Sequence, residues 1–66
     1  MGEDSLANRE VIIEFHTVGA YVKVTAMDVQ TMTEISIQGS IHSSEEILKN
    51  AALKRLSYVM KKKSAD

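Results

Sequence analysis

Residues 33–56 read TEISIQGSIHSSEEILKNAALKRL, and the hydrophobic period changes within this stretch. Ile35 and Ile37 alternate with polar residues, as in a strand with one buried face. From Ile47 onward, apolar residues recur every three or four positions, as in a helix. The alternating pattern also extends back along the chain to Val11. The change of period therefore predicts a sheet followed by one helix.

Three strands are predicted, over residues 10–18, 20–28 and 33–39. Gly19 supplies the turn between the first two, and residues 29–32 form a four-residue hairpin loop. The carboxylate of Asp28 can accept backbone N–H groups of this loop. The short connections favour an antiparallel meander with the second strand in the centre. Gly39 and Ser40 are expected to end the sheet.

Ser43 and Glu46 match the pattern of a capping box, so a helix is expected from about Ser44 to Lys62. Acidic residues fall in its first turn and lysines in its last, as the helix dipole favours. Apolar residues cover about 240° of its circumference, whereas a one-sided helix needs an apolar arc of only ~100° or somewhat more. The predicted fold class is α+β: a three-stranded antiparallel β-meander followed by one C-terminal amphipathic helix.

The alternation also predicts which side chains form the core. Those expected to be buried are Val11, Ile13, Phe15, Val22, Val24, Ile35 and Ile37 of the sheet, under Leu48, Ala52, Leu56 and Val59 of the helix. The opposite face of the sheet is mixed in character, which suits either solvent or a modest contact. A single domain is expected over residues 10–63, between a flexible tail at 1–9 and a short tail at 64–66.

Self-association is predicted from size. A 66-residue chain buries a small share of its surface, and small domains are usually stabilised by disulfides, metals or oligomerisation. The sequence has no cysteine, which leaves oligomerisation as the simplest of these. The over-wide apolar arc supports a homodimer, either through the helix or through pairing of edge strands. The candidate dimer contacts on the helix are Ile47, Ala51, Leu53, Tyr58 and Met60.

The chain resembles a family of short alphaproteobacterial proteins known as a domain of unknown function. The resemblance lies in residues 10–15 (EVIIEF), 18–28 (VGAYVKVTAMD) and 33–37 (TEISI), and in the basic helix at 53–62 (LKRLSYVMKK). Members of that family typically have glycine where Met32 stands here, and a non-glycine residue is penalised for a positive φ, so this departure leaves the conformation of the loop at residues 29–32 open. The resemblance implies a bacterial cytoplasmic origin, and it brings no catalytic residues with it.

No recognised chemistry-bearing motif is present. The three glycines are too far apart to form a phosphate loop, and nothing matches a nucleophile elbow or a metal motif. His16 and His42 are the only histidines, and His16 is expected to be a solvated strand residue. We therefore expect a non-catalytic protein without a cofactor or metal. The acidic start of the chain is the reverse of a signal peptide, and no apolar run could span a bilayer, so a cytoplasmic, non-membrane protein is expected.

Basic residues gather towards the end of the chain. Residues 45–63 contain six cations and two acids, a net +4 in a chain whose net charge is −1. The candidate nucleic-acid contacts are Lys54, Arg55, Lys61, Lys62 and Lys63. The simpler interpretation is a solvated helix end, since few aromatic residues accompany these cations. The leading hypothesis is a small protein-interaction module whose partner is another copy or a different protein. The alternative is weak, nonspecific binding of nucleic acid.

Overall fold

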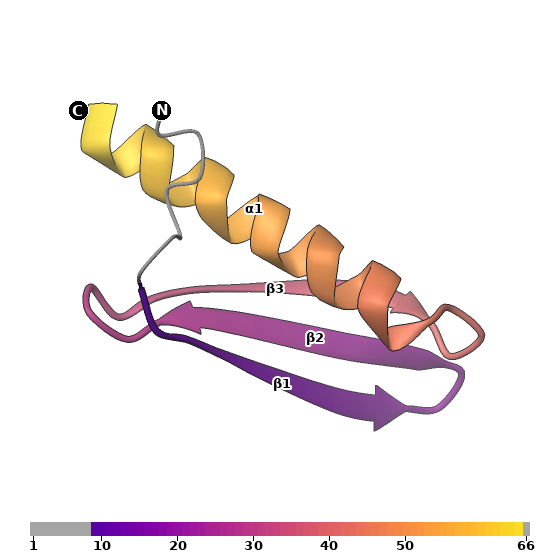
Figure 1. The fold of residues 1–66 in the computed structure, drawn as a ribbon. Coiled ribbons are helices and arrows are strands. Elements are labelled where there is room, and N and C mark those ends of the chain that lie inside the picture. Colours follow the sequence, from indigo (N-terminus) through magenta and orange to yellow (C-terminus); the bar gives the residue numbers. More distant parts are fainter. Residues whose placement is uncertain (1–8, 66) are drawn as a thin grey trace.

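The computed structural model of the protein describes residues 9–65, with side chains placed for 9–63. The elements, in chain order, are β1 (Val11–Val18), β2 (Tyr21–Asp28), β3 (Thr33–Ser40) and α1 (Glu45–Ala65). The strands form one antiparallel sheet in the order β1-β2-β3, and α1 lies across one face of it (Figure 1). The predicted meander followed by one helix is confirmed. Residues 1–8 of the tail expected at residues 1–9 lie outside the described part.

The second hairpin has the four-residue loop that the sequence predicts, whereas the first turn contains Ala20 as well as Gly19, because β2 begins at Tyr21. Gly19 turns the first with φ 60°, a conformation that glycine adopts without steric cost. In the second, the backbone N–H of Met32 donates to the carbonyl of Asp28 at 2.8 Å, and Met32 has φ 61°. It is the only non-glycine residue with a positive φ in the part of the chain that the structure describes. The conformation that the sequence left open is thus left-handed at Met32, whose side chain is exposed.

The link between sheet and helix differs from its prediction in two details. β3 ends at Ser40, one residue beyond the predicted end at Gly39, and Gly39 and Ser40 lie opposite Val22 and Tyr21 of β2. The helix cap is Ser44 rather than Ser43, because the Ser44 hydroxyl oxygen accepts the backbone N–H of Ile47 at 3.1 Å. The N–H of Ser43 closes a turn onto the carbonyl of Ser40 at 3.0 Å. The capping box therefore does not form, and α1 continues past the expected end at Lys62.

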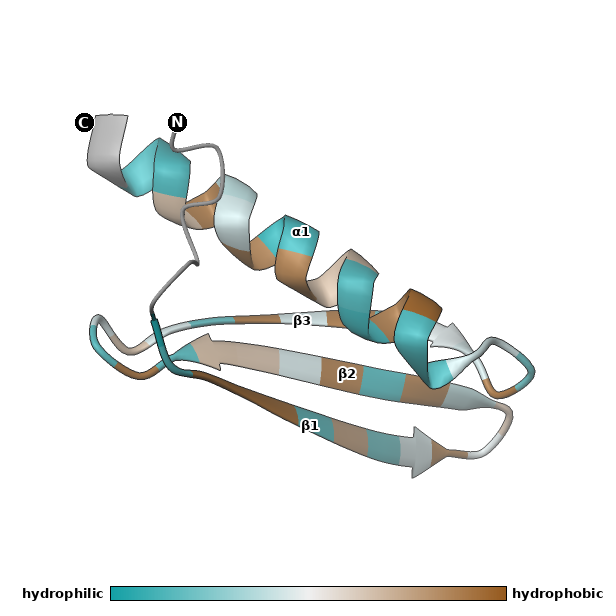
Figure 2. Ribbon diagram, viewed as in Figure 1, coloured by the Kyte–Doolittle hydropathy of each residue, from teal (hydrophilic) through white to brown (hydrophobic). Residues whose placement is uncertain are grey.

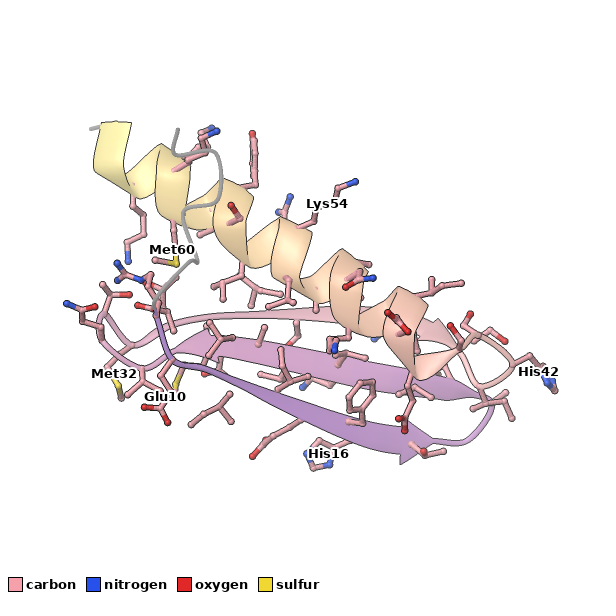
Figure 3. The ribbon with its side chains drawn as sticks, viewed as in Figure 1. Glu10, His16, Met32, His42, Lys54 and Met60 are labelled. Atoms are coloured by element: carbon pink, nitrogen blue, oxygen red, sulfur yellow. The ribbon has the colours of Figure 1, made fainter. Side chains whose placement is uncertain are left out.

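The core lies between α1 and the central strand. Buried apolar residues are Val24 and Ala26 of β2 with Leu48, Ala52, Leu56 and Met60 of α1, and Val11, Ile13, Val22, Ile35 and Ile37 pack partly buried around them. The predicted burial of Val24 is confirmed. Phe15 is a correction, since it is 36% exposed rather than in the core. Met60 is a second correction, because this candidate dimer contact points from α1 towards the sheet (Figure 3) and lies in the core of its own subunit.

The position of α1 explains these corrections. The helix packs on β2 and β3, antiparallel to β3, and leaves β1 at the uncovered side of the sheet (Figure 1). The first turns of α1 lie close to the end of β3 at Gly39. A Cβ on this residue would overlap the side chain of Leu48. In Figure 2, β1 begins with an unbroken apolar stretch, and apolar and polar residues alternate further along it, but only the inner face of β2 and β3 meets the helix. The apolar inner face of β1 is therefore left half open.

Candidate interaction surfaces

The space beside the helix is a groove of about 900 Å³ between α1 and the inner face of β1. Val11 and Ile13 line it from the strand. Ile47, Ala51 and Leu53 line it from the helix, together with polar residues that include Lys49 and Lys54. The groove is open to solvent, so these apolar side chains are incompletely covered within the monomer.

Both faces of β1 expose large apolar side chains. Phe15, on the inner face, is 36% exposed, while Ile12 and Val18, on the outer face, are 42% and 47% exposed. Scattered exposed apolar residues are normal on a protein surface, but here they share one eight-residue strand. The opposite edge strand, β3, carries polar side chains on its outer face, and its inner face is packed by α1. Of the two edge strands, β1 is therefore the one that exposes large apolar side chains on both faces.

Along this edge, the backbone of β1 also has groups that no other strand of the described residues pairs. In an antiparallel pair, alternate residues direct both N–H and C=O at the neighbouring strand. The N–H of Val29 donates to the carbonyl of Glu10, its partner in the extended register, at 3.1 Å. The even-numbered residues of β1 therefore face β2, and the N–H and C=O groups of Val11, Ile13, Phe15 and Thr17 point away from the sheet. Such an edge is a ready template for another strand.

The candidate dimer contacts on α1 do not form one surface. Ile47 and Tyr58 are 64% and 53% exposed, and Ala51 is also exposed. Leu53 is half-buried at the groove, and Met60 lies in the core. Exposed Tyr58 is itself flanked by cations, with Arg55 5.6 Å and Lys62 5.9 Å from its ring centroid. The outer face of the helix is therefore a mixture of single apolar residues and charges.

The basic residues are likewise divided around α1. Lys54 points outward (Figure 3) and lines the groove, whereas Arg55 and Lys62 flank Tyr58. Lys61, an exposed residue, follows Lys54 by seven positions and so lies on the same side. Lys63 points towards the sheet and donates to the hydroxyl of Thr33 at 3.3 Å. The five candidate nucleic-acid contacts are all on one helix, but they face in different directions.

A buried ion pair is the feature that the sequence interpretation missed. Asp28 has no exposed surface, and it accepts two hydrogen bonds of 2.9 Å from the Nε and an Nη of Arg9. Thr31 donates its backbone N–H at 2.9 Å and its hydroxyl at 2.7 Å to the same carboxylate, as predicted for the turn. The hydrogen bonds from Arg9 first, then those from Thr31, outweigh burial and hold the pKa of Asp28 well below its usual range.

This pair belongs to a longer chain of hydrogen bonds. Because the hydroxyl proton of Thr31 goes to Asp28, the hydroxyl of Thr33 donates to Thr31 at 2.8 Å and in turn accepts from Lys63. The chain ties the segment before β1 and the second hairpin to the end of α1. Arg9 is therefore not part of a flexible tail. The sequence did contain a signal for this ion pair. Asp28 continues the alternation of inner-face positions along β2, and a carboxylate buried there needs a partner.

The histidines lie apart from these features. His16 projects from the outer face of the sheet, its Nε2 3.7 Å from the Glu14 carboxylate, and both side chains are more than 60% exposed. His42 lies in the exposed link before α1, at the far end of the strands in Figure 3. Within residues 9–63, no three or more histidine, cysteine, aspartate or glutamate side chains gather where they could hold a metal ion.

One protein family matches almost the whole of the chain. Residues 8–63 match the family described as Domain of unknown function (DUF6898). The chain belongs to this family. The match includes every strand, most of the helix and both partners of the Arg9–Asp28 pair, so the family unit is the whole β-β-β-α domain. No curated protein is significantly similar to the chain, and neither is any solved structure. Over the described residues, no helix is both long and apolar enough to cross a bilayer.

Proposed function

We propose that this DUF6898 protein is a small non-catalytic interaction module that works as a homodimer. The observation that supports this most is the state of β1, which combines an uncovered apolar inner face with an unpaired backbone edge. Covering that strand would remove the main apolar surface that the monomer leaves open. A 66-residue domain has little other means of gaining stability, since it contains no cysteine.

The route through the edge strand is better supported than the route through the helix. Ile47 and Ala51 of α1 line the groove beside β1, which leaves Tyr58 as the large exposed side chain on the rest of the helix. Arg55 and Lys62 flank Tyr58, so a two-fold contact there would bring like charges together. On β1 the exposed apolar side chains lie beside backbone N–H and C=O groups that face outward. Addition of another strand covers these side chains and pairs these backbone groups, because main-chain hydrogen bonds give affinity and side chains give specificity.

Binding of nucleic acid is the weaker hypothesis. Its candidate cations face different sides of α1, and Lys63 is engaged by Thr33. A phosphate backbone is bound most strongly by cations that lie along one surface. The bacterial cytoplasmic setting implied by the family resemblance suits either role.

Sedimentation equilibrium at micromolar concentration tests the proposal. The wild type should sediment at twice 7.3 kDa. Phe15→Lys should sediment as a monomer, because it places a charge in the middle of the edge. Tyr58→Lys, an equally non-conservative change at an exposed residue of α1 that does not line the groove, should remain dimeric. A wild-type monomer would refute the proposed function. A dimer broken by Tyr58→Lys and not by Phe15→Lys would place the contact on the helix instead.

A further inference from the structure

Backbone N–H and C=O groups face outward only at every second residue of β1, and this alternation restricts how a second copy can pair with the edge. Only odd-numbered residues direct N–H and C=O groups outward, so an antiparallel β1–β1 pair must bond odd residues to odd residues. This places both helices on the same face of the extended sheet. The remaining freedom is the register, which is fixed by the residue that sits on the two-fold axis.

Length limits the choice to two registers. An axis at Glu14 pairs residues 11–17 of each strand, and an axis at Phe15 pairs residues 12–18. An axis at Ile13 or His16 leaves a shorter overlap within β1, with fewer hydrogen bonds between the two copies.

Side chains distinguish the two long registers. With the axis at Glu14, that carboxylate faces its own copy across the non-hydrogen-bonded pair, and like charges directly opposite are destabilising. With the axis at Phe15, Glu14 faces the partner's His16, and Ile12 faces the partner's Val18. The two exposed apolar residues of the outer face then cover each other, and the two Phe15 rings meet on the inner face.

We propose that two copies of the chain pair through β1 with Phe15 on the two-fold axis, forming one six-stranded antiparallel sheet with both helices on the same face. This rests on the proposed function and specifies its contact. Each of Ile13, Phe15 and Thr17 donates one backbone hydrogen bond to the partner and accepts one. The most exposed apolar side chains of β1 are then covered without any change within the subunit.

Introduced cysteines test the register, because the chain has none of its own. In a non-hydrogen-bonded antiparallel pair, Cα atoms lie about 4.5 Å apart, within the ~4.4–6.8 Å of a disulfide. Glu14→Cys mixed with His16→Cys should give a disulfide-linked heterodimer under mild oxidation, detected by intact mass. Both positions are exposed, so the substitutions leave the monomer fold intact.

Each other outcome overturns the register. If Glu14→Cys links efficiently to itself, the axis is at Glu14, and if it links instead to Ile12→Cys, the axis is at Ile13. If His16→Cys links instead to itself, the axis is at His16. Absence of all four links, from samples that sediment as dimers, would mean that the dimer does not use this edge. The same absence from samples that sediment as monomers would refute the proposed function as well, so the two failures are distinguishable.

Discussion

Replacing Val24 by aspartate should abolish folding. Val24 has no exposed surface, lies between Phe15 and Ile37 in the register of the sheet, and is covered by α1. A carboxylate at this position would have neither water nor a cation, and an isolated buried charge costs more than several kcal/mol. A domain of this size has a total stability of only about 3–10 kcal/mol. The far-ultraviolet circular dichroism spectrum of Val24→Asp should therefore be that of an unfolded chain.

The matched control is Thr25→Asp, one residue along the same strand. Thr25 faces the opposite side of the sheet, where its hydroxyl contacts that of Ser36 at 3.1 Å. Its partner in β1 is Glu14, so the new carboxylate meets a like charge and a small loss of stability is expected. The spectrum should nevertheless stay folded. A folded Val24→Asp beside an unfolded Thr25→Asp would show that the two faces of the sheet are assigned the wrong way round.

Replacing Asp28 by asparagine should give the second largest effect. The change removes the charge that Arg9 requires and places an amide donor where Arg9 and Thr31 both donate. Removing one partner of a buried ion pair is strongly destabilising, because the other is left uncompensated. Urea denaturation at pH 7 should show a clearly lower midpoint than the wild type. Glu34→Gln, an exposed acid in the neighbouring strand, should leave the midpoint unchanged.

The same pair predicts how stability depends on pH. The pKa of Asp28 is lowered in the folded state, so its ionised form stabilises the fold at every pH above the ~3.9 of an unfolded aspartate. This contribution is lost as the pH falls below that value. The wild type should therefore lose its advantage over Asp28→Asn on acidification below about pH 4, while the difference stays constant between pH 5 and 7. A difference that persists unchanged at pH 2 would contradict the ion-pair account.

Periodicity was enough to predict the elements and their faces. The two-residue alternation located the strands to within a residue at each end, and it correctly buried Val24. The Asp28 turn followed from local chemistry, because the Asp28 carboxylate bonds only three residues along the chain to Thr31. These features depend on short stretches of sequence, which a single chain displays directly.

The position of the helix over the sheet could not be predicted in this way. Hydrophobic periodicity indicates which face of a strand is apolar, but it does not indicate which strands a single helix covers. A single helix is narrower than three strands, since strands lie about 4.8 Å apart and a helix is about 10 Å across. It covers β2 and β3, so Phe15 is exposed and Met60 is buried, contrary to both predictions. The Arg9–Asp28 pair was missed because it joins residues nineteen apart.

Amide hydrogen exchange along β1 tests the central claim most directly. In the monomer, the N–H groups of Ile13, Phe15 and Thr17 point away from the sheet, whereas those of the even-numbered residues bond to β2. Dimerisation through this edge predicts that the three odd-numbered amides are protected at high protein concentration and lose that protection on dilution. If they exchange as fast as a free peptide at every concentration, while their even-numbered neighbours stay protected, the β1 edge is not the site of self-association.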